Sequence, residues 1–524
     1  MNLLAAATLA LPSVNYTTIL PELILLGWML VLLASSALVT RPIPTEAFAV
    51  ATSGSGIASL IASLILWHDV QDHGPFTAIA HAIAVDGFYC FVLVLVSCVM
   101  IIAPLLAASF LRRESLPGPE YYVLALISAS GAMFMASAND LILIFLGLEI
   151  LSIPLYVMAG FDHRREASSE AAMKYFVLGA FSSAVFLYGI ALTYGATGSL
   201  NLAEIGGFLA NNTLVHQGVL LAGLGLLIVG FGFKVAAVPF HMWTPDVYQG
   251  SPTPAVGFMA SVAKIGGFAG LLRVCISTFP TLAQTWQPIL WVLAVATLVL
   301  GAVLALVQRD LKRMLAYSSI NHAGFVLIGV QAGTGRGLAG SLYYLFAYSF
   351  LVLGSFAVVA VVGGRGDNAH DLSNYRGLAK RSPLLAVTFA VLLLAQAGAP
   401  FTTGFFAKFY VVTASVAAHS YALAVIAMLS AGIAAFFYLR VVFLMFGDTE
   451  GEEAITPVPV AAAAAPGGHG GLGTAVQTLP ATVRLEIDSW VASGLGICVL
   501  MSVFFGIWPQ PLISFAHDAT FLFH

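Results

Sequence analysis

Charged residues are scarce in this chain. Of its 524 residues only 8% are Asp, Glu, Lys or Arg, whereas an ordinary soluble domain has roughly 25%. This composition excludes a soluble globular protein. The formal net charge of −4 is small for the length, and no basic run interleaved with aromatic residues indicates nucleic-acid binding.

Cysteine is scarcer still, with four residues, and these are not spaced for metal binding. Cys90, Cys98, Cys275 and Cys498 all lie in apolar segments without C-x-x-C spacing, which argues against an iron–sulfur or zinc site. The chain also lacks a nucleotide-binding fingerprint. We therefore expect no cofactor and no metal in this chain, and we interpret the cysteines as small apolar packing residues.

Basic residues are missing from the N-terminal part of the chain before Arg41. A cleavable signal peptide needs a positively charged region ahead of its apolar segment. We therefore expect the first helix to remain in the mature protein.

What the sequence does contain is hydrophobic length. Hydrophobic residues make up 60% of the chain, and a bilayer-spanning helix needs about 20 mainly apolar residues. The sequence thus predicts an all-α polytopic membrane protein with 14 transmembrane helices. Their approximate ranges are 19–40, 47–67, 84–110, 120–138, 139–161, 170–196, 217–245, 253–277, 287–307, 312–332, 337–363, 383–412, 419–446 and 490–512.

Lys and Arg concentrate in the loops that follow odd-numbered predicted spans. The loops after even-numbered spans hold only Arg336. Because basic loops stay cytoplasmic, we expect both termini on the outer side of the membrane. The Pro/Ala/Gly-rich stretch before the last span, 448–486, is typical of a flexible linker and is expected in the cytoplasm.

Three short sequences recur in the same order. "NDLILIFLGLEI" from Asn139 resembles "RDLKRMLAYSSI" from Arg309, "VPFHMW" around Pro239 resembles "APFTTGF" around Pro400, and "LLRV" resembles "YLRV" at offsets of 170, 161 and 167 residues. Two copies of a five-helix unit, helices 4–8 and 9–13, explain this pattern, and an odd number of helices inverts one copy. The predicted organisation is 1–112, helices 1–3; 113–280, first repeat; 281–447, second repeat; 448–486, linker; and 487–524, helix 14 and C-terminus.

Prolines fall in matching places in the two copies. Pro239 in helix 7 and Pro400 in helix 12 each remove a backbone hydrogen bond, which predicts discontinuous helices. Broken helices at matching positions of inverted repeats are typical of transport proteins, whose site lies at the breaks. A packing kink is the alternative interpretation of either proline taken alone.

Ionisable residues occur near the middle of several predicted spans. Glu149, Lys234, Lys264 and His322 each lie about ten residues from a span end, which is about 15 Å deep in a core of about 30 Å. Lys408 follows the break in helix 12. Charges at this depth are costly and are commonly functional, so the set indicates a proton pathway. A structural ion pair between Glu149 and a lysine is the alternative.

Two further residues are candidates for the same pathway. Lys174 lies one or two turns into helix 6, where it could relay protons or extend to the cytoplasm. His241, just after Pro239, could accept a proton at the cytoplasmic mouth or bond freed backbone groups.

Five longer segments resemble a known family. "GLEILSIPLYVMAGF", "EAAMKYFVLGAFSSA", "FKVAAVPFHMWTPDVYQGSPTPAVGFMASVAK", "RDLKRMLAYSSINHAGF" and "GAPFTTGFFAKFYV" closely resemble the antiporter-like membrane subunits of proton-pumping NADH:quinone oxidoreductase, respiratory complex I. The resemblance covers nearly the whole chain. Lys264, Lys408 and the Leu-Glu-Ile form around Glu149 resemble the smallest of these subunits more than its larger relatives.

The resemblance implies roles for the buried residues. Glu149 and Lys234 would form the family's Glu/Lys pair, Lys264 the central relay residue and Lys408 the terminal residue facing the outer exit. It also implies a bacterial inner-membrane location and partners in the other membrane-arm subunits. FMN, iron–sulfur clusters and quinone would belong to those partners.

Three functions are consistent with these features. The leading one is a cofactor-free proton-translocating subunit driven by quinone reduction elsewhere in the complex. The alternative is a subunit of a multi-subunit sodium/proton antiporter. A third is a scaffold whose buried charges only fix helix packing.

Overall fold

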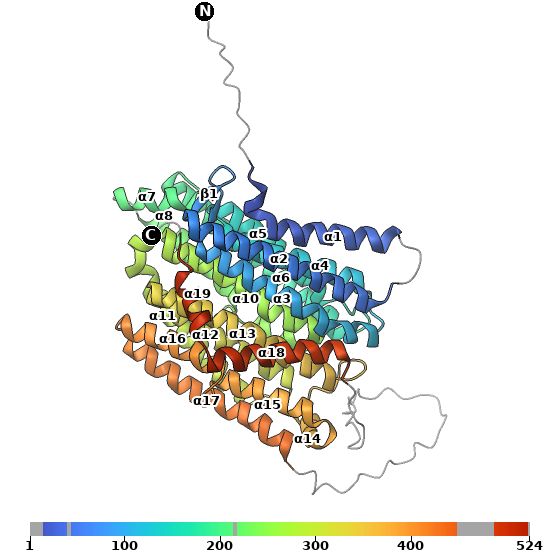
Figure 1. The fold of residues 1–524 in the computed structure, drawn as a ribbon. Coiled ribbons are helices and arrows are strands. Elements are labelled where there is room, and N and C mark those ends of the chain that lie inside the picture. Colours follow the sequence, from blue (N-terminus) through green and yellow to red (C-terminus); the bar gives the residue numbers. More distant parts are fainter. Residues whose placement is uncertain (1–13, 39–42, 213–216, 448–486, 522–524) are drawn as a thin grey trace, which may run out of the picture.

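The computed structural model describes residues 14–38, 43–212, 217–447 and 487–521, and these residues form a bundle of helices. Most of the helices run side by side across the molecule (Figure 1). The predicted linker 448–486 lies outside the described residues.

In the part of the chain that the structure describes, eleven helices are long and apolar enough to cross a membrane. They are α1 (Leu20–Leu38, preceded by the 3-10 turn η1, Tyr16–Ile19), α2 (Thr45–His73), α3 (Gly87–Arg113), α5 (Leu141–Ala159), α6 (Glu166–Thr197), α8 (Gly218–Val235), α10 (Thr253–Leu272, continued by the π-helical turn η2, Arg273–Thr278), α11 (Ala283–Leu306, preceded by η3, Pro280–Leu282), α13 (Gly335–Val362), α17 (Tyr421–Phe446) and α18 (Ser489–Ile507).

Two further long helices are more polar, and the remaining helices are shorter. The long ones are α4 (Gly118–Ser137) and α12 (Leu311–Ala332); the shorter ones are α7 (Leu202–Asn211), α9 (Trp243–Gly250), η4 (Leu372–Tyr375), α14 (Leu378–Arg381), α15 (Pro383–Ala397), α16 (Thr403–Ala417) and α19 (Gln510–Asp518). The eleven spans, α4, α12 and the α15–α16 pair occupy the 14 predicted ranges. The count of 14 crossings and the inverted repeat remain predictions.

Both predicted helix breaks are present. α8 ends at Val235, Ala236 takes a left-handed conformation, and α9 begins only at Trp243. In the second break α15 ends at Ala397, and Gly398 takes the left-handed conformation before α16 begins. Each break therefore places the carbonyl end of one short helix inside the bundle.

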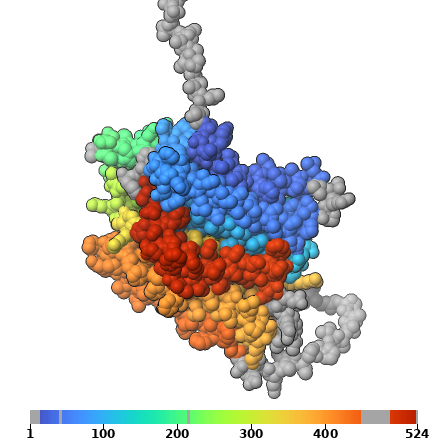
Figure 2. Space-filling model, in the orientation of Figure 1, coloured from blue at the N-terminus to red at the C-terminus, as the bar shows by residue number. Residues whose placement is uncertain are grey.

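The central helices are almost completely enclosed by protein. The most apolar part of α10 and η2 is 100% buried and that of α13 is 94% buried, against 28% for α1 at the periphery. α18 lies across the molecule between the N-terminal helices and the orange C-terminal ones (Figure 2) and packs on α3, α13 and α16. Side chains on α10 and α13 therefore meet protein rather than lipid.

One element departs from the all-α prediction. Strands β1 (Phe76–Ala78) and β2 (Ile83–Val85) pair antiparallel between α2 and α3, with Phe76 opposite Val85. Residues 79–81 close the hairpin with positive φ angles. The segment is too short to span a bilayer, and its backbone groups are satisfied by pairing with each other.

Candidate functional site

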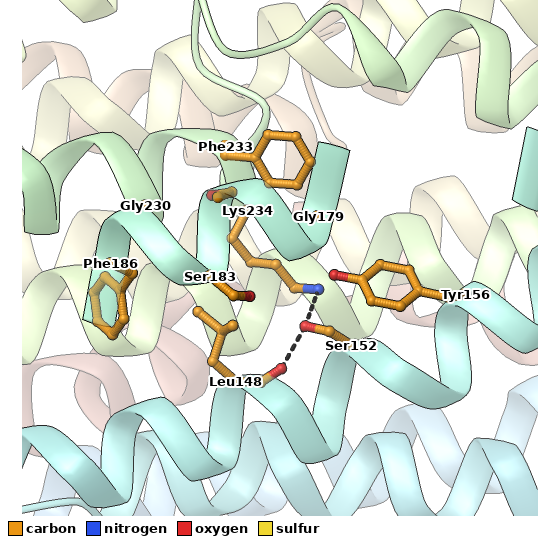
Figure 3. A pocket seen from close by; sticks show the side chains of 10 residues that line it. Leu148, Ser152, Tyr156, Gly179, Ser183, Phe186, Gly230, Phe233 and Lys234 are labelled. Atoms are coloured by element: carbon orange, nitrogen blue, oxygen red, sulfur yellow. Dashed lines mark hydrogen bonds between the residues drawn. The ribbon is translucent and has the colours of Figure 1, made fainter. Parts of the chain in front are cut away.

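Lys234 lies at the end of α8 and points to α5 and α6. Its side chain is 3% exposed, and its ammonium donates to Ser152 Oγ at 2.7 Å and to Tyr175 OH at 3.5 Å. Figure 3 shows the lysine side chain extended toward Ser152 and Tyr156. The ammonium is therefore held by neutral hydroxyl groups.

Glu149 is close to this lysine along α5 but does not bond to it. It precedes Ser152 by three residues, which places both on one face of the helix. Glu149 Oε1 is buried without a hydrogen-bond partner, and among the described residues no ion pair within 4.0 Å joins Glu149 to a lysine. In this conformation Ser152, not Glu149, takes the Lys234 ammonium, and the functional Glu149/Lys234 pair remains a prediction.

A small cavity lies beside the Lys234 ammonium. Its volume is about 10 Å³, and its lining includes Leu148, Ser152, Tyr156 and Lys234 (Figure 3). A cavity needs roughly 10–15 Å³ of space open to a water-sized sphere to hold one water molecule. The space therefore admits about one water next to the lysine.

Lys264 lies on α10 and completes the backbone of the first break. Its ammonium, 3% exposed, donates to Val235 O at 3.1 Å and to Ser319 O at 2.8 Å. In a continuous helix Val235 O would accept from residue 239, but Pro239 has no N–H. Lys264 thus binds the carbonyl that the proline leaves unpaired, at a helix end whose dipole favours a cation.

Other freed groups at this break are also satisfied. Val238 N–H donates to Thr297 Oγ1 at 2.9 Å, and Trp243 Nε1 donates to Phe233 O at 3.1 Å. The break is therefore stabilised by the surrounding structure and is more than a bend, because side chains bond its free backbone groups.

Residues of α12 and α13 lie beside both Lys264 and His322. Ser319, whose carbonyl bonds Lys264, precedes His322 by three residues on α12, and its hydroxyl accepts from Tyr348 OH at 2.8 Å. The Tyr348 ring lies 5.9 Å from Lys264 Nζ and 5.0 Å from the His322 ring. Lys264 and His322 thus share one polar neighbourhood inside the bundle.

Both ring nitrogens of His322 bond to tyrosines. Nδ1 lies 2.6 Å from Tyr344 OH and Nε2 lies 3.0 Å from Tyr438 OH, and the side chain is 4% exposed. Tyr438 OH also bonds Ser318 Oγ and donates to Gln396 Oε1 at 3.4 Å. The histidine is therefore the centre of a hydroxyl network that joins α12, α13, α15 and α17.

Lys408 lies on α16 and binds the second break. Its ammonium, in a side chain 6% exposed, donates to Ala397 O, the last residue of α15, at 2.7 Å. Lys408 Nζ is 5.1 Å from the Phe325 ring, which stacks on Tyr344 at 5.9 Å. An aromatic ring therefore separates Lys408 from the His322 network.

Lys174 is not buried with Lys234, Lys264 and Lys408. Its side chain is 42% exposed and pairs with Glu170 at 2.7 Å and Asp246 at 3.0 Å. Asp246 also pairs with Arg313 at 2.8 Å. The structure thus supports the surface interpretation of Lys174, and it places Asp246 between two cations.

His241 lies in the connection between α8 and α9. The residue is half-buried, and its Nδ1 is buried without a hydrogen-bond partner. The neighbouring Pro239 and Met242 are exposed, Met242 by 75%. His241 therefore sits near the outside of the bundle rather than beside Lys234.

Two other buried cations, Arg273 and Lys312, are paired with carboxylates. Arg273 contacts both carboxylate oxygens of Asp86 at 2.9 Å, and it is 1% exposed. The long Arg273 side chain turns inward to Asp86 and does not reach the surface of the described chain. Lys312, 0% exposed, lies 3.3 Å from Asp367 Oδ2.

Asp367 lies in the loop after α13, where it gathers several donors. Thr253 Oγ1 donates to it at 2.6 Å, and Arg165 and His370 lie within 3.2 Å and 3.1 Å of its carboxylate. Burial alone would raise the pKa of the Asp367 carboxyl, but Lys312, His370 and Arg165 hold that pKa well below its usual value. Its network ties the loops before α6, α10 and η4 to the start of α12.

Sequence reasoning missed the hydroxyl groups around the charges. The hydroxyls of Ser152, Tyr344 and Tyr438 contact Lys234 or His322. Ser319 binds Lys264 through its backbone carbonyl, and its hydroxyl accepts from Tyr348. Helical spacing is the signal that could have indicated some of them, because Ser152 and Ser319 lie three residues from Glu149 and His322. Tyr438 lies on α17, and only the packing of that helix brings it to His322.

Comparison with protein families and curated relatives gives consistent matches. The family described as "NADH:quinone oxidoreductase/Mrp antiporter, TM" matches residues 138–434. The NADH-quinone oxidoreductase subunit N of Parafrankia sp. (strain EAN1pec) is 39% identical over 548 residues, covering 98% of this chain and 97% of the relative. The subunit N of Mycobacterium tuberculosis (strain ATCC 25618 / H37Rv) is 44% identical over 414 residues, covering 78% of this chain and 72% of the relative.

Solved structures share the fold. A chain of respiratory complex I from Thermus thermophilus, in a structure with bound aureothin, is 31% identical with a TM-score of 0.75 and covers 94% of this chain and 98% of that chain. A chain of the Mrp complex from Dietzia sp. DQ12-45-1b is 21% identical with a TM-score of 0.79, covering 95% and 97%. At this lower identity the likeness concerns the fold alone.

Proposed function

The chain belongs to the NADH-quinone oxidoreductase subunit N family, and we propose that it moves protons through Glu149, Lys234, Lys264, His322 and Lys408. It is a multi-span, proton-translocating membrane-arm subunit of this translocase. Quinone reduction in partner subunits, which would carry the FMN and iron–sulfur clusters, drives the movement. The location is the bacterial inner membrane, with both termini outside.

One observation supports the proposed residues: among the described contacts Lys234, Lys264 and Lys408 donate only to neutral oxygens, whereas Lys312, also buried, donates to Ser251 O and lies 3.3 Å from the Asp367 carboxylate. Lys234 donates to hydroxyls, whereas Lys264 and Lys408 donate to backbone carbonyls. Arg273 and Lys312, equally buried, face carboxylates. A charge that only fixes packing is stabilised by an opposite charge, whereas an ammonium held by neutral acceptors can lose its proton without leaving an unpaired anion.

The inward half of the route comprises Glu149 and Lys234. Glu149 lies one helical turn from Ser152, which holds the ammonium, and a single water fits beside them. A small movement of the lysine from Ser152 toward Glu149 would form the charge pair and raise the proton affinity of the lysine. Returning to Ser152 would lower it, which makes this contact a switch.

The central part comprises Lys264 and His322. Ser319 and Tyr348 are neighbours of both groups, and because no continuous hydrogen-bond chain joins Lys264 to His322 among the described contacts, transfer between them needs a water molecule or a side-chain movement. Histidine can bind and release a proton through its two nitrogens, and each faces a tyrosine hydroxyl. A proton held by His322 can thus be exchanged with the hydroxyls of Tyr344 and Tyr438.

Lys408 receives the proton last, toward the outer side. Phe325 lies between it and the His322 network, so in this conformation the outward step is closed. Rotation of the Phe325 ring or admission of water past it would open that step. The arrangement thus keeps the inward and outward halves from connecting freely.

Lys174 and His241 play peripheral parts in this proposal. The paired charges of Lys174, Asp246 and Arg313 form a half-exposed cluster that can collect protons near the first break. His241 is half-buried in that break. Neither residue is needed inside the bundle.

Substitution of Lys264 by arginine separates proton transfer from charge placement. Arginine keeps the positive charge and the donors but does not release its proton, so Lys264→Arg should assemble and slow transfer at this step by roughly 100-fold. The measurement is protons pumped per NADH oxidised by the assembled complex in vesicles. Lys312→Arg is the matched control, because it keeps its pair with Asp367 and should pump normally.

The scaffold hypothesis predicts a different result. If the buried charges only fix packing, Lys264→Arg would pump with unchanged stoichiometry, and the proton route would be wrong. The sodium/proton antiporter alternative is distinguished by sodium-dependent proton exchange in the absence of NADH oxidation. The named relatives favour NADH:quinone oxidoreductase over that alternative.

A further inference from the structure

A groove on the outside of α17 combines apolar side chains with two arginines. Its volume is about 620 Å³, and it is lined by Phe436, Leu439, Phe443 and Leu444 together with Arg376 and Arg440. α17 runs along the edge of the bundle (Figure 1). None of the residues that line the groove belongs to the proposed proton route.

The apolar side chains form a continuous stripe on the helix. Phe436 and Phe443 are seven residues apart, so they lie on one face, and they are 65% and 72% exposed. Arg440 lies between them on the same face. Such a stripe has little contact with the rest of the described chain, so a ligand from outside can cover it.

One charge lies within this stripe and the other beside it. Arg440 is six residues before the end of α17, and Arg376 is at the end of η4, outside the long helices. Arg440 Nη1 donates to Leu306 O at 3.2 Å, which fixes the guanidinium and leaves further N–H donors in its planar fork. All the polar side chains that line the groove are cationic.

We propose that this groove binds an anionic phospholipid, with its phosphodiester on Arg376 and Arg440 and an acyl chain along Phe436 and Phe443. Guanidinium groups match phosphate oxygens in a bidentate manner, and basic pockets at the membrane boundary hold lipid headgroups. A free phosphate would use the arginines but not the exposed aromatic stripe. A lipid uses both, because its charge and its hydrocarbon are joined in one molecule.

A photoreactive lipid tests this proposal in the assembled complex. Phosphatidylglycerol and phosphatidylcholine, each with a diazirine near the start of one acyl chain, are incorporated separately in vesicles, and labelled peptides are mapped. Phosphatidylglycerol should label α17 around Phe436 to Phe443. The double variant Arg376→Gln/Arg440→Gln should lose roughly 30-fold in binding, because each arginine near the surface contributes roughly a fivefold factor.

Two controls distinguish this site from general charge attraction. Arg309→Gln removes an exposed arginine from the loop before α12 and should leave the labelling of α17 unchanged. Arg440→Lys keeps the charge but not the fork and should give intermediate labelling.

Three results would overturn the proposal. The first is equal labelling of α17 by phosphatidylcholine, and the second is full labelling in the double variant. The third is that a neighbouring subunit covers α17 and prevents the lipid from labelling it. The last result would identify the groove as a contact between subunits.

Discussion

At the scale of single residues, the hydroxyl groups determine how the buried charges can act. A lysine bonded to a carboxylate is stabilised as a cation, whereas one bonded to Ser152 or to a backbone carbonyl keeps the option of deprotonation. His322 depends in the same way on Tyr344 and Tyr438. The polar atoms around a charge therefore carry as much of the mechanism as the charge itself.

Tyr438→Phe tests this dependence at His322. The substitution removes the hydroxyl that contacts His322, Ser318 and Gln396 but keeps the ring. We expect a loss of about 1 kcal/mol for one hydrogen bond, or roughly a fivefold lower pumping rate. Pumping and quinone reduction are measured together in vesicles.

Tyr421→Phe is the matched control for that experiment. Tyr421 lies on the same helix, but it is 56% exposed and bonds only His419 among the described contacts. It should have no effect. A Tyr438→Phe complex with normal pumping would show that the His322 network is not part of the route.

The sequence located the charges better than their partners. Depth along an apolar span depends only on counting, so Glu149, Lys234, Lys264 and His322 could be selected from the chain alone. Whether Lys234 meets Glu149 or Ser152 depends on a difference of one helical turn. Such a difference is set by packing of α5 against α6 and α8, which no local pattern encodes.

At the scale of elements, close helix contacts hold the breaks in place. A Cβ on Gly267 of α10 would lie 2.9 Å from Val235 Cγ1 and 3.2 Å from Lys234 Cγ. A Cβ on Gly404 of α16 would lie 1.7 Å from Ala395 O, near the end of α15. At each break a glycine of the next helix packs so closely against the broken helix that a Cβ would clash.

Gly267→Ala should disturb the first break without changing a charge. The added methyl must displace Val235 or the Lys234 stem, and overpacking of this kind typically costs about 1–3 kcal/mol. We expect a lower unfolding temperature of the complex and slower pumping. Gly225→Ala on α8 is the control, because its Cβ would meet nothing within 4 Å. Equal behaviour of the two variants would mean that contact at Gly267 is unimportant.

The breaks themselves could be predicted because proline acts locally. Pro239 lacks an N–H wherever it stands, so an unpaired carbonyl at Val235 follows from the sequence. The choice of Lys264 as its donor does not, since the lysine comes from another helix. The β1–β2 hairpin was also missed, because a few residues between two apolar spans give too short an alternating pattern to distinguish a strand from a loop.

At the scale of the whole molecule, Asp367 connects the two halves of the chain on one side of the bundle. Its partners Arg165 and Thr253 precede residue 280, whereas Lys312 and His370 follow it. The same carboxylate therefore holds loops from both predicted repeats. A relay that crosses between the halves needs them to keep a fixed relative position, and this network supplies a polar contact for that purpose.

Asp367→Asn should lower the stability of the complex in a pH-dependent manner. Its cationic partners depress the pKa of Asp367 in the folded chain, so its contribution is fully present above the ordinary Asp pKa of about 4 and is lost as pH falls through the folded value. The gap in unfolding temperature between wild type and variant should be constant from about pH 7 to 5 and narrow only below about pH 4. Asp371→Asn is the control, because asparagine can keep the cap bond to Ser373 N. A gap that narrows already between pH 7 and 5 would mean that the pKa of Asp367 is not depressed, and no gap at neutral pH would mean that the network does not stabilise the two halves.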